Sequence, residues 1–290
     1  MLIVYDGSFP AVLSHRDSGA FARQEIGQEK TTSGMARVFI TGSSDGLGRM
    51  AAQLLLEQGH NVVLHARNEK RAKQALAAVP GAETVVIGDL ASIAQTRGVA
   101  DQVNRLGLFD AVIHNAGVGY REPEHISTED GLPQLFAVNT LAPYILTALI
   151  QRPKRLVYIS SMLHKSGDTS LKDLAWEHRP WQGSQAYSDS KMHDVMLAFA
   201  VARRWRDVFS NAIEPGWVAT KMGGPGAPDD LDAAHRTQVW LATSDEPAAK
   251  VTGEYFYHMR LRPPLAATRD PERQKRLLEA CKGFSGVELP

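Results

Sequence analysis

The chain has 290 residues, and its 32 Lys and Arg balance 32 Asp and Glu, so its formal net charge at pH 7 is zero. This balance excludes the strong overall field that draws proteins onto nucleic acids or anionic membranes, and we expect neither partner. Hydrophobic residues make up 43% and charged residues 22%, which is a globular composition, and the single cysteine, Cys281, excludes an intramolecular disulfide.

The richest apolar stretches are too short to cross a membrane. They cover residues 141–150 and 196–202, whereas a spanning helix needs about 18 or more apolar residues. We therefore expect a cytoplasmic protein.

The first predicted segment, residues 1–34, shows neither helical nor strand periodicity and lacks the basic start and apolar core of a signal peptide. We interpret it as an N-terminal extension, either a loose or disordered appendage or an arm that packs on a partner subunit. A single domain is expected over residues 35–290.

Within that domain, short apolar segments alternate with longer segments of helical period. The apolar segments are candidate parallel strands buried on both faces, at residues 38–40, 62–64, 85–87, 111–113 and 156–159. The helical patterns cover residues 47–58, 70–78, 93–106, 132–151, 186–205 and 272–282. This alternation predicts an α/β fold, a Rossmann-type doubly wound parallel sheet, whose ligands bind at the carboxyl ends of the strands.

A glycine-rich turn, Thr41-Gly42-Ser43-Ser44-Asp45-Gly46-Leu47-Gly48, directly follows the first predicted strand. In a nucleotide site the backbone must turn sharply, approach a pyrophosphate and pack the helix start on the sheet, and each demand excludes a side chain. The helix amino terminus then directs its free N–H groups at the phosphates. Its position after a strand favours a nucleotide site over a plain loop.

The glycine spacing resembles the TGxxxGxG motif of the short-chain dehydrogenase/reductase family. The family's other motifs follow in order: Asn115-Ala116-Gly117, Asn139, Ser160-Ser161, Tyr187-x-x-x-Lys191, Pro215-Gly216 and Thr220. The resemblance covers about residues 36–260. The long stretch between Ser161 and Tyr187 is most similar to the retinol-dehydrogenase-like and protochlorophyllide-reductase-like branch.

The end of the second predicted strand indicates which nicotinamide cofactor binds. NAD enzymes of this fold place Asp or Glu there to hold the ribose 2′-hydroxyl. Here Arg67 stands 19 residues after Gly48, and its guanidinium suits the 2′-phosphate of NADP. NADP is therefore expected, with NAD held through Glu69 as the alternative. The predicted cofactor-binding residues are Gly42, Ser43, Ser44, Gly46, Leu47, Gly48, Arg67, Asp89, Leu90, Asn115, Ala116, Gly117, Tyr187, Lys191, Pro215, Gly216 and Thr220.

Tyr187 and Lys191 lie four residues apart in a helical pattern, so they share one face. A tyrosine has a pKa near 10, and an ammonium about 4 Å away contributes about 4 kcal/mol at an effective dielectric near 20. We therefore expect Lys191 to lower the pKa of Tyr187 toward the working pH. Ser161, 26 residues earlier at a strand end, is placed to hold a substrate oxygen.

The family resemblance implies a role for each catalytic residue. Tyr187 exchanges a proton with the substrate oxygen as hydride moves, Ser161 hydrogen-bonds that oxygen, and Lys191 also binds the nicotinamide ribose. Asn139 positions a water that relays protons to Lys191, and Thr220 contacts the carboxamide.

The resemblance therefore implies an NADP-dependent oxidoreductase that interconverts a carbonyl and an alcohol on a small, moderately apolar substrate. Two alternatives stay open. One is reduction of an activated carbon–carbon double bond with the same cofactor, and the other is a non-catalytic NADP-sensing regulatory protein.

Two segments bear on the substrate. The stretch before Tyr187 contains Leu171, Leu174, Trp176 and Trp181, which form either a wall of an apolar pocket or local loop packing. Residues 216–230 are rich in glycine and proline, and we expect this loop to close over the substrate.

Two further expectations concern partners and metals. Residues 132–151 and 186–205 match the helices through which many family members associate, so a homo-oligomer is an expected partner state. The ten histidines show no metal-ligand spacing, and no metal is expected.

Overall fold

The computed structural model describes residues 34–120 and 122–290. The predicted N-terminal extension therefore lies, apart from Gly34, outside the described residues.

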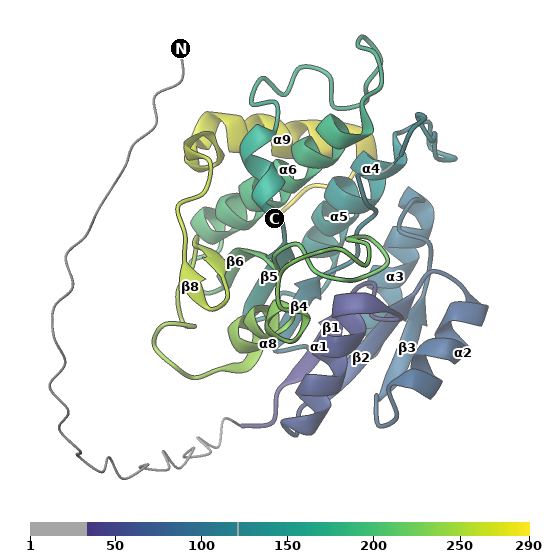
Figure 1. Cartoon of the computed structure of the whole chain (residues 1–290), viewed down its shortest axis with the longest axis vertical. Coiled ribbons are helices and arrows are strands. Elements are labelled where there is room, and N and C mark those ends of the chain that lie inside the picture. Colours follow the sequence, from purple (N-terminus) through teal and green to yellow (C-terminus); the bar gives the residue numbers. More distant parts are fainter. Residues whose placement is uncertain (1–33, 121) are drawn as a thin grey trace, which may run out of the picture. The chain divides into compact units, whose positions relative to one another are not determined.

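The described residues form one sheet in the order β3-β2-β1-β4-β5-β6-β7-β8 (Figure 1). The strands are β1 (Arg37–Ile40), β2 (Asn61–Ala66), β3 (Thr84–Ile87), β4 (Ala111–His114), β5 (Arg155–Ile159), β6 (Phe209–Glu214), β7 (Tyr255–Tyr257) and β8 (Arg260–Leu261). All neighbouring pairs are parallel except β7 and β8. The strand order reverses between β1 and β4, which is where such sheets open a ligand crevice. The predicted fold class is confirmed.

Helices cover both faces of this sheet. They are α1 (Gly46–Glu57), α2 (Glu69–Ala78), α3 (Ile93–Arg105), α4 (Gln134–Phe136), the π-helix η1 (Ala137–Leu141), α5 (Ala142–Leu149), the 3-10 helix η2 (Met162–Ser166), α6 (Gly183–Arg204), α7 (Leu231–Ala234), α8 (Arg236–Thr243), the 3-10 helix η3 (Ala266–Arg269) and α9 (Pro271–Ser285). α1, α2 and α8 bury one apolar core against the sheet. α3, α5, α6 and α9 bury a larger one on the opposite face.

The single helix expected over residues 132–151 is wrong in detail. It is divided into α4, η1 and α5, with the π-helix in the middle. Pro143 has no N–H to give to the carbonyl of Asn139, so the ordinary helical ladder is interrupted there. π-helical turns of this kind often mark functional sites, and this one contains Asn139.

The C-terminal segment packs on the helices expected to mediate association. The Tyr144 hydroxyl in α5 donates to the Val287 carbonyl at 2.8 Å, and the Trp205 indole after α6 donates to the Pro290 carbonyl at 2.8 Å. Val287 and Leu289 are buried there. The chain's own tail therefore covers part of the α5 and α6 surface.

Candidate active site

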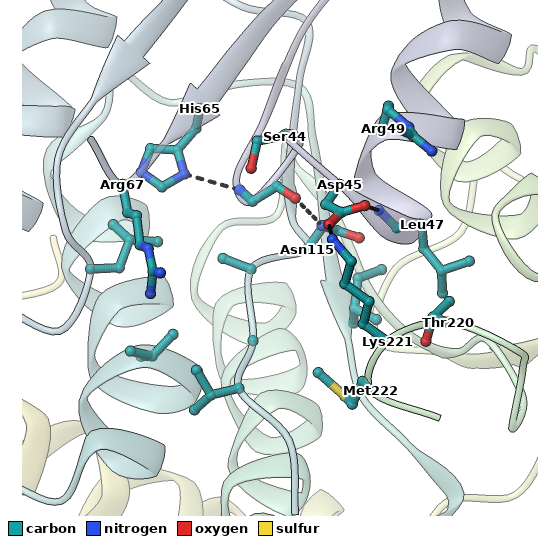
Figure 2. Close-up of a pocket in the computed structure, with 18 of the residues that line it drawn as sticks. Ser44, Asp45, Leu47, Arg49, His65, Arg67, Asn115, Thr220, Lys221 and Met222 are labelled. Carbon is teal, nitrogen blue, oxygen red and sulfur yellow. Dashed lines mark hydrogen bonds and ion pairs between the residues drawn. The ribbon is translucent and has the colours of Figure 1, made fainter. Parts of the chain in front are cut away.

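A cleft of about 690 Å³ lies at the carboxyl ends of the central strands. Figure 2 shows residues of the glycine turn, the end of β2 and the loop after β6 converging on it. The predicted residues that line the cleft are Gly42, Ser44, Gly46, Leu47, Arg67, Asp89, Leu90, Asn115, Ala116, Gly117, Tyr187, Lys191, Pro215 and Thr220. Ser43, Gly48, Asn139, Ser161 and Gly216 do not belong to the lining.

The glycine turn packs tightly on the end of β4. A Cβ on Gly42, whose φ is +63°, would lie 2.7 Å from the Ala116 Cα, and a Cβ on Gly48 would lie 2.3 Å from the Asn115 Nδ2. The Asn115 amide itself donates to the carbonyls of Thr41 at 3.0 Å and Gly42 at 3.2 Å. Two of the glycines are thus required by packing within the protein, before any nucleotide is considered.

Ser43 shapes the turn from inside. Its buried hydroxyl donates to the Ile40 carbonyl at 3.0 Å and accepts from the His65 backbone N–H at 2.8 Å. The His65 ring completes the connection, since Nδ1 accepts from the Gly42 N–H at 3.0 Å and Nε2 lies 3.0 Å from the Gly88 carbonyl. Burial lowers the pKa of His65 to about 4, so the ring is neutral at pH 7. Sequence reasoning missed this role.

Arg67 lines the cleft at the end of β2, as predicted (Figure 2). Its guanidinium is exposed and makes no hydrogen bond or ion pair within residues 34–120 and 122–290. Glu69, the alternative ribose ligand, is not in the cleft lining. A second arginine, Arg71 in α2, also lines the cleft and lies 3.5 Å from the Asp45 carboxylate.

Tyr187, Lys191 and Ser161 come together as predicted. The Lys191 Nζ lies 5.7 Å from the centre of the Tyr187 ring. Ser161, directly after β5, is near enough to Tyr187 to act on the pKa of its hydroxyl. Lys191 donates to the Ile159 carbonyl at 2.8 Å and to the Asp194 carboxylate at 2.8 Å. The group joins the end of β5 to one face of α6, beside the glycine turn.

Burial opposes the expected lowering of the Tyr187 pKa. Burial raises the pKa of Tyr187, and the nearby Lys191 charge, which acts in the opposite direction, does not overcome it. Lys191 is itself paired with Asp194, which the expectation did not include. Tyr187 is therefore a phenol at neutral pH.

Asn139 lies behind these residues in η1. Its Oδ1 accepts from the Val118 N–H at 2.8 Å, and its Nδ2 donates to the Val118 carbonyl at 3.1 Å and to the Ser190 hydroxyl at 3.0 Å. The Asn139 side chain thus ties the segment after Gly117 to α6. Its water-relay role stays a prediction.

The loop over residues 216–230 reaches across the cleft. The Lys221 ammonium pairs with the Asp45 carboxylate at the start of α1, and the Met222 Sδ lies 3.9 Å from the Tyr187 hydroxyl (Figure 2). The hydrogen bond from Lys221 lowers the pKa of Asp45 to about 2. Sequence reasoning missed both contacts, although Lys221 directly follows the predicted Thr220.

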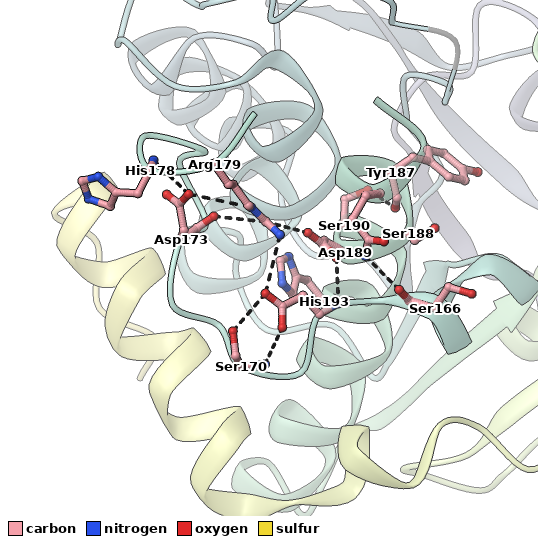
Figure 3. A network of polar contacts seen from close by, with 12 residues as sticks. Ser166, Ser170, Asp173, His178, Arg179, Tyr187, Ser188, Asp189, Ser190 and His193 are labelled. Carbon is pink, nitrogen blue, oxygen red and sulfur yellow. Dashed lines mark hydrogen bonds and ion pairs between the residues drawn. The ribbon is translucent and has the colours of Figure 1, made fainter. Parts of the chain in front are cut away.

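Aromatic side chains surround Tyr187 on the other side. Tyr120 stands edge-on to Tyr187, with 5.7 Å between the ring centres, and Trp176 and Trp181 pack in the same cluster. Arg179 covers the Trp176 ring at 3.6 Å and pairs with Asp189 in α6 at 2.8 Å, within the network of Figure 3. Leu171 and Leu174 pack instead against the main core.

The described part of the chain contains no group of three or more His, Cys, Asp or Glu placed to hold a metal ion. Among those same residues, no helix is both long and apolar enough to cross a membrane.

Comparison with known proteins places this geometry in a family. The family model described as "short chain dehydrogenase" matches residues 36–230. An uncharacterized oxidoreductase of Emericella nidulans is 47% identical over 260 residues, which cover 88% of this chain and 99% of that protein. The short-chain dehydrogenase chyC of Penicillium rubens is 43% identical over 260 residues, with 88% and 100% covered. Human retinol dehydrogenase 13 is 29% identical over 286 residues, with 87% and 85% covered.

Solved structures agree with the fold. The crystal structure of an uncharacterized protein from Mycobacterium Paratuberculosis has a TM-score of 0.75 and 26% identity, covering 88% of this chain and 95% of that one. A blue fluorescent protein from a metagenomic library, solved in complex with NADPH, has a TM-score of 0.62 and 22% identity, with 78% and 96% covered.

The chain belongs to the short-chain dehydrogenase/reductase family. It is an NAD(P)-dependent oxidoreductase.

Proposed function

We propose that the protein uses NADP to interconvert a carbonyl and an alcohol on a small, moderately apolar substrate. The observation that carries this proposal is the pair Tyr187 and Lys191, next to Ser161, in a cleft that the glycine turn also lines. Arg67 lines the same cleft and has no ionic partner among the described residues.

The protein's own residues fit NADP. The turn packs so closely on Asn115 and Ala116 that neither Gly42 nor Gly48 has room for a side chain. The N-terminal end of α1 faces the cleft, as phosphate binding requires. Arg67 offers its free guanidinium where the ribose 2′-phosphate is expected. Arg71 and Lys221 add positive charge to the lining.

In the reductive direction, a nicotinamide nucleotide held by the glycine turn and Arg67 would supply a hydride, with its electron pair, to the carbonyl carbon. Ser161 donates a hydrogen bond to the carbonyl oxygen, and Tyr187 transfers its phenolic proton to that oxygen as it gains charge. Lys191 stabilises the resulting tyrosinate. The raised pKa of Tyr187 means that the phenol carries the required proton at neutral pH.

The first test is a screen of aldehydes, ketones and enones for NADPH oxidation, with product analysis. We expect alcohol products and at least a hundredfold loss of turnover in Tyr187→Phe, because general acid catalysis contributes roughly 10²- to 10⁴-fold. Saturated carbonyl products from enones would replace this proposal with carbon–carbon double bond reduction. Binding of NADPH without Tyr187-dependent turnover would indicate a nucleotide sensor.

Cofactor preference is tested with Arg67→Ala. We expect NADPH to bind about ten- to a hundredfold more weakly, since a hydrogen bond to a charged group contributes about 1.5 to 3 kcal/mol, while NADH binding stays within about twofold. Arg105→Ala is the control, because that arginine is also exposed but does not line the cleft. Equal weakening of NADH and NADPH would refute the assignment to the 2′-phosphate.

A further inference from the structure

A buried carboxylate lies directly behind the catalytic lysine. Asp194 is one helical turn after Lys191 in α6, and its Oδ2 is 2.8 Å from the Lys191 Nζ. The side chains of Lys191 and Asp194 are only 6% and 3% exposed. Lys191 lines the cleft and Asp194 does not, so Asp194 can act on the cleft only through Lys191.

We propose that Asp194 is a positioning residue of this site, whose carboxylate fixes the Lys191 ammonium beside Tyr187 and keeps it charged there. The inference rests on the proposed function for its catalytic meaning, but the state of Lys191 itself is measurable without turnover.

The geometry supports both parts of the proposal. Two of the three Lys191 N–H donors are directed, one to Asp194 and one to the Ile159 carbonyl at 2.8 Å. This leaves one donor for the cleft, where a Cβ built on Gly117 would lie 3.6 Å from Nζ. Without a fixed partner, the flexible four-carbon side chain of Lys191 would sample other rotamers, and its ammonium would no longer stay beside Tyr187.

The charge argument follows from burial. Desolvation alone would lower the pKa of Lys191, but the neighbouring Asp194 charge reverses this and raises it. The ionisable groups facing the pair are Tyr187 on α6, Tyr158 from β5 and, next to Tyr187, Tyr120 from the segment after β4. None of these tyrosines is an anion at neutral pH, so among the described residues the Asp194 carboxylate contributes most to keeping Lys191 protonated.

The first experiment measures thermal unfolding of the full chain without cofactor between about pH 7 and about pH 10. Asp194→Asn keeps a hydrogen-bond acceptor but removes the charge. The pKa of the buried Lys191 in the folded variant should then fall below the value of roughly 10.4 that it has in an unfolded chain. When the pKa of a basic group is lower in the folded than in the unfolded state, the free energy of unfolding rises with pH. The Tm gap between wild type and Asp194→Asn should therefore shrink by at least half over this range.

Asp189→Asn is the matched control. Asp189 is equally buried on the same helix and pairs with Arg179 at 2.8 Å (Figure 3). Because an arginine does not deprotonate in this pH range, the difference in Tm between wild type and Asp189→Asn should stay constant with pH. Asp194→Glu, which keeps the charge, should also show a constant gap. If Asp194→Asn does not yield folded protein, Asp194→Ser serves as the charge-free variant.

The second experiment measures kcat/KM for carbonyl reduction against pH. We expect the alkaline loss of activity to move down by about one pH unit or more in the charge-free variant, and to stay unchanged in Asp194→Glu and Asp189→Asn. A Tm gap that is constant with pH, or a pH profile that overlays the wild-type profile, would overturn the role of Asp194. Absence of turnover in the wild type would overturn the proposed function alone, because the unfolding result does not depend on it.

Discussion

The contact between Gly48 and Asn115 makes a sharp prediction about the glycine turn. Alanine at position 48 would place its Cβ 2.3 Å from the Asn115 Nδ2 and 2.7 Å from the Gly42 carbonyl oxygen. Relief requires the Asn115 amide to move away, which breaks its two hydrogen bonds to the carbonyls of Thr41 and Gly42. At about 1 kcal/mol each, plus the cost of unpaired carbonyls, the loss is about 3 to 4 kcal/mol, against a helix-propensity gain of about 1 kcal/mol.

We therefore expect Gly48→Ala to destabilise the protein by about 2 to 3 kcal/mol and to weaken NADPH binding about tenfold or more. Gly98→Ala is the control, since Gly98 lies within α3 and a Cβ there meets nothing within 4 Å. That variant should be more stable by about 0.5 to 1 kcal/mol and bind NADPH normally. Urea unfolding and fluorescence titration measure both quantities. A Gly48→Ala protein as stable as Gly98→Ala would refute the packing argument.

Two other predictions concern pH and the cleft loop. Burial lowers the pKa of His65 and His193 to about 4 and that of His114 to about 3, so unfolded chains bind more protons below about pH 6.5. Unfolding free energy should fall by roughly 1 kcal/mol per histidine at about pH 5.5, and a urea midpoint unchanged between about pH 7 and 5.5 would contradict this. Lys221→Ala removes a mostly exposed ion pair with Asp45, so it should change stability by less than about 1 kcal/mol but speed NADPH release several-fold. Stopped-flow displacement of NADPH measures the release rate, and equal rates would exclude a role of Lys221 in retention.

Sequence patterns predicted β1 to β5, each of which contains an apolar segment, and missed β6 and the short strands β7 and β8. The strand β6 escaped notice because Ser210 and Asn211 interrupt its apolar pattern. Both are buried, and their side chains bond the carbonyls of Ala198 and Val251. A local pattern cannot tell such residues from exposed polar ones, because their partners lie on other elements.

The candidate site shows the same division. Spacing placed Tyr187 and Lys191 on one helix face, whereas Ser161 at the end of β5 was assigned through the family resemblance. Asp194 has the spacing of a helical neighbour of Lys191, but only its burial indicates that the pair is tight. Met222 reaches Tyr187 through the path of an irregular loop, for which no periodicity exists.

The carboxylate of Asp45 has three partners. It caps α1 by accepting from the Gly46 N–H at 2.9 Å, lies 3.5 Å from the Arg71 guanidinium and pairs with Lys221 from the loop across the cleft. If the loop moved away, Arg71 alone would offset the Asp45 charge at the entrance of the cleft. Any anion that binds here and draws Lys221 from Asp45 would change the free energy of the loop position, and by linkage the loop position would change anion affinity by the same amount.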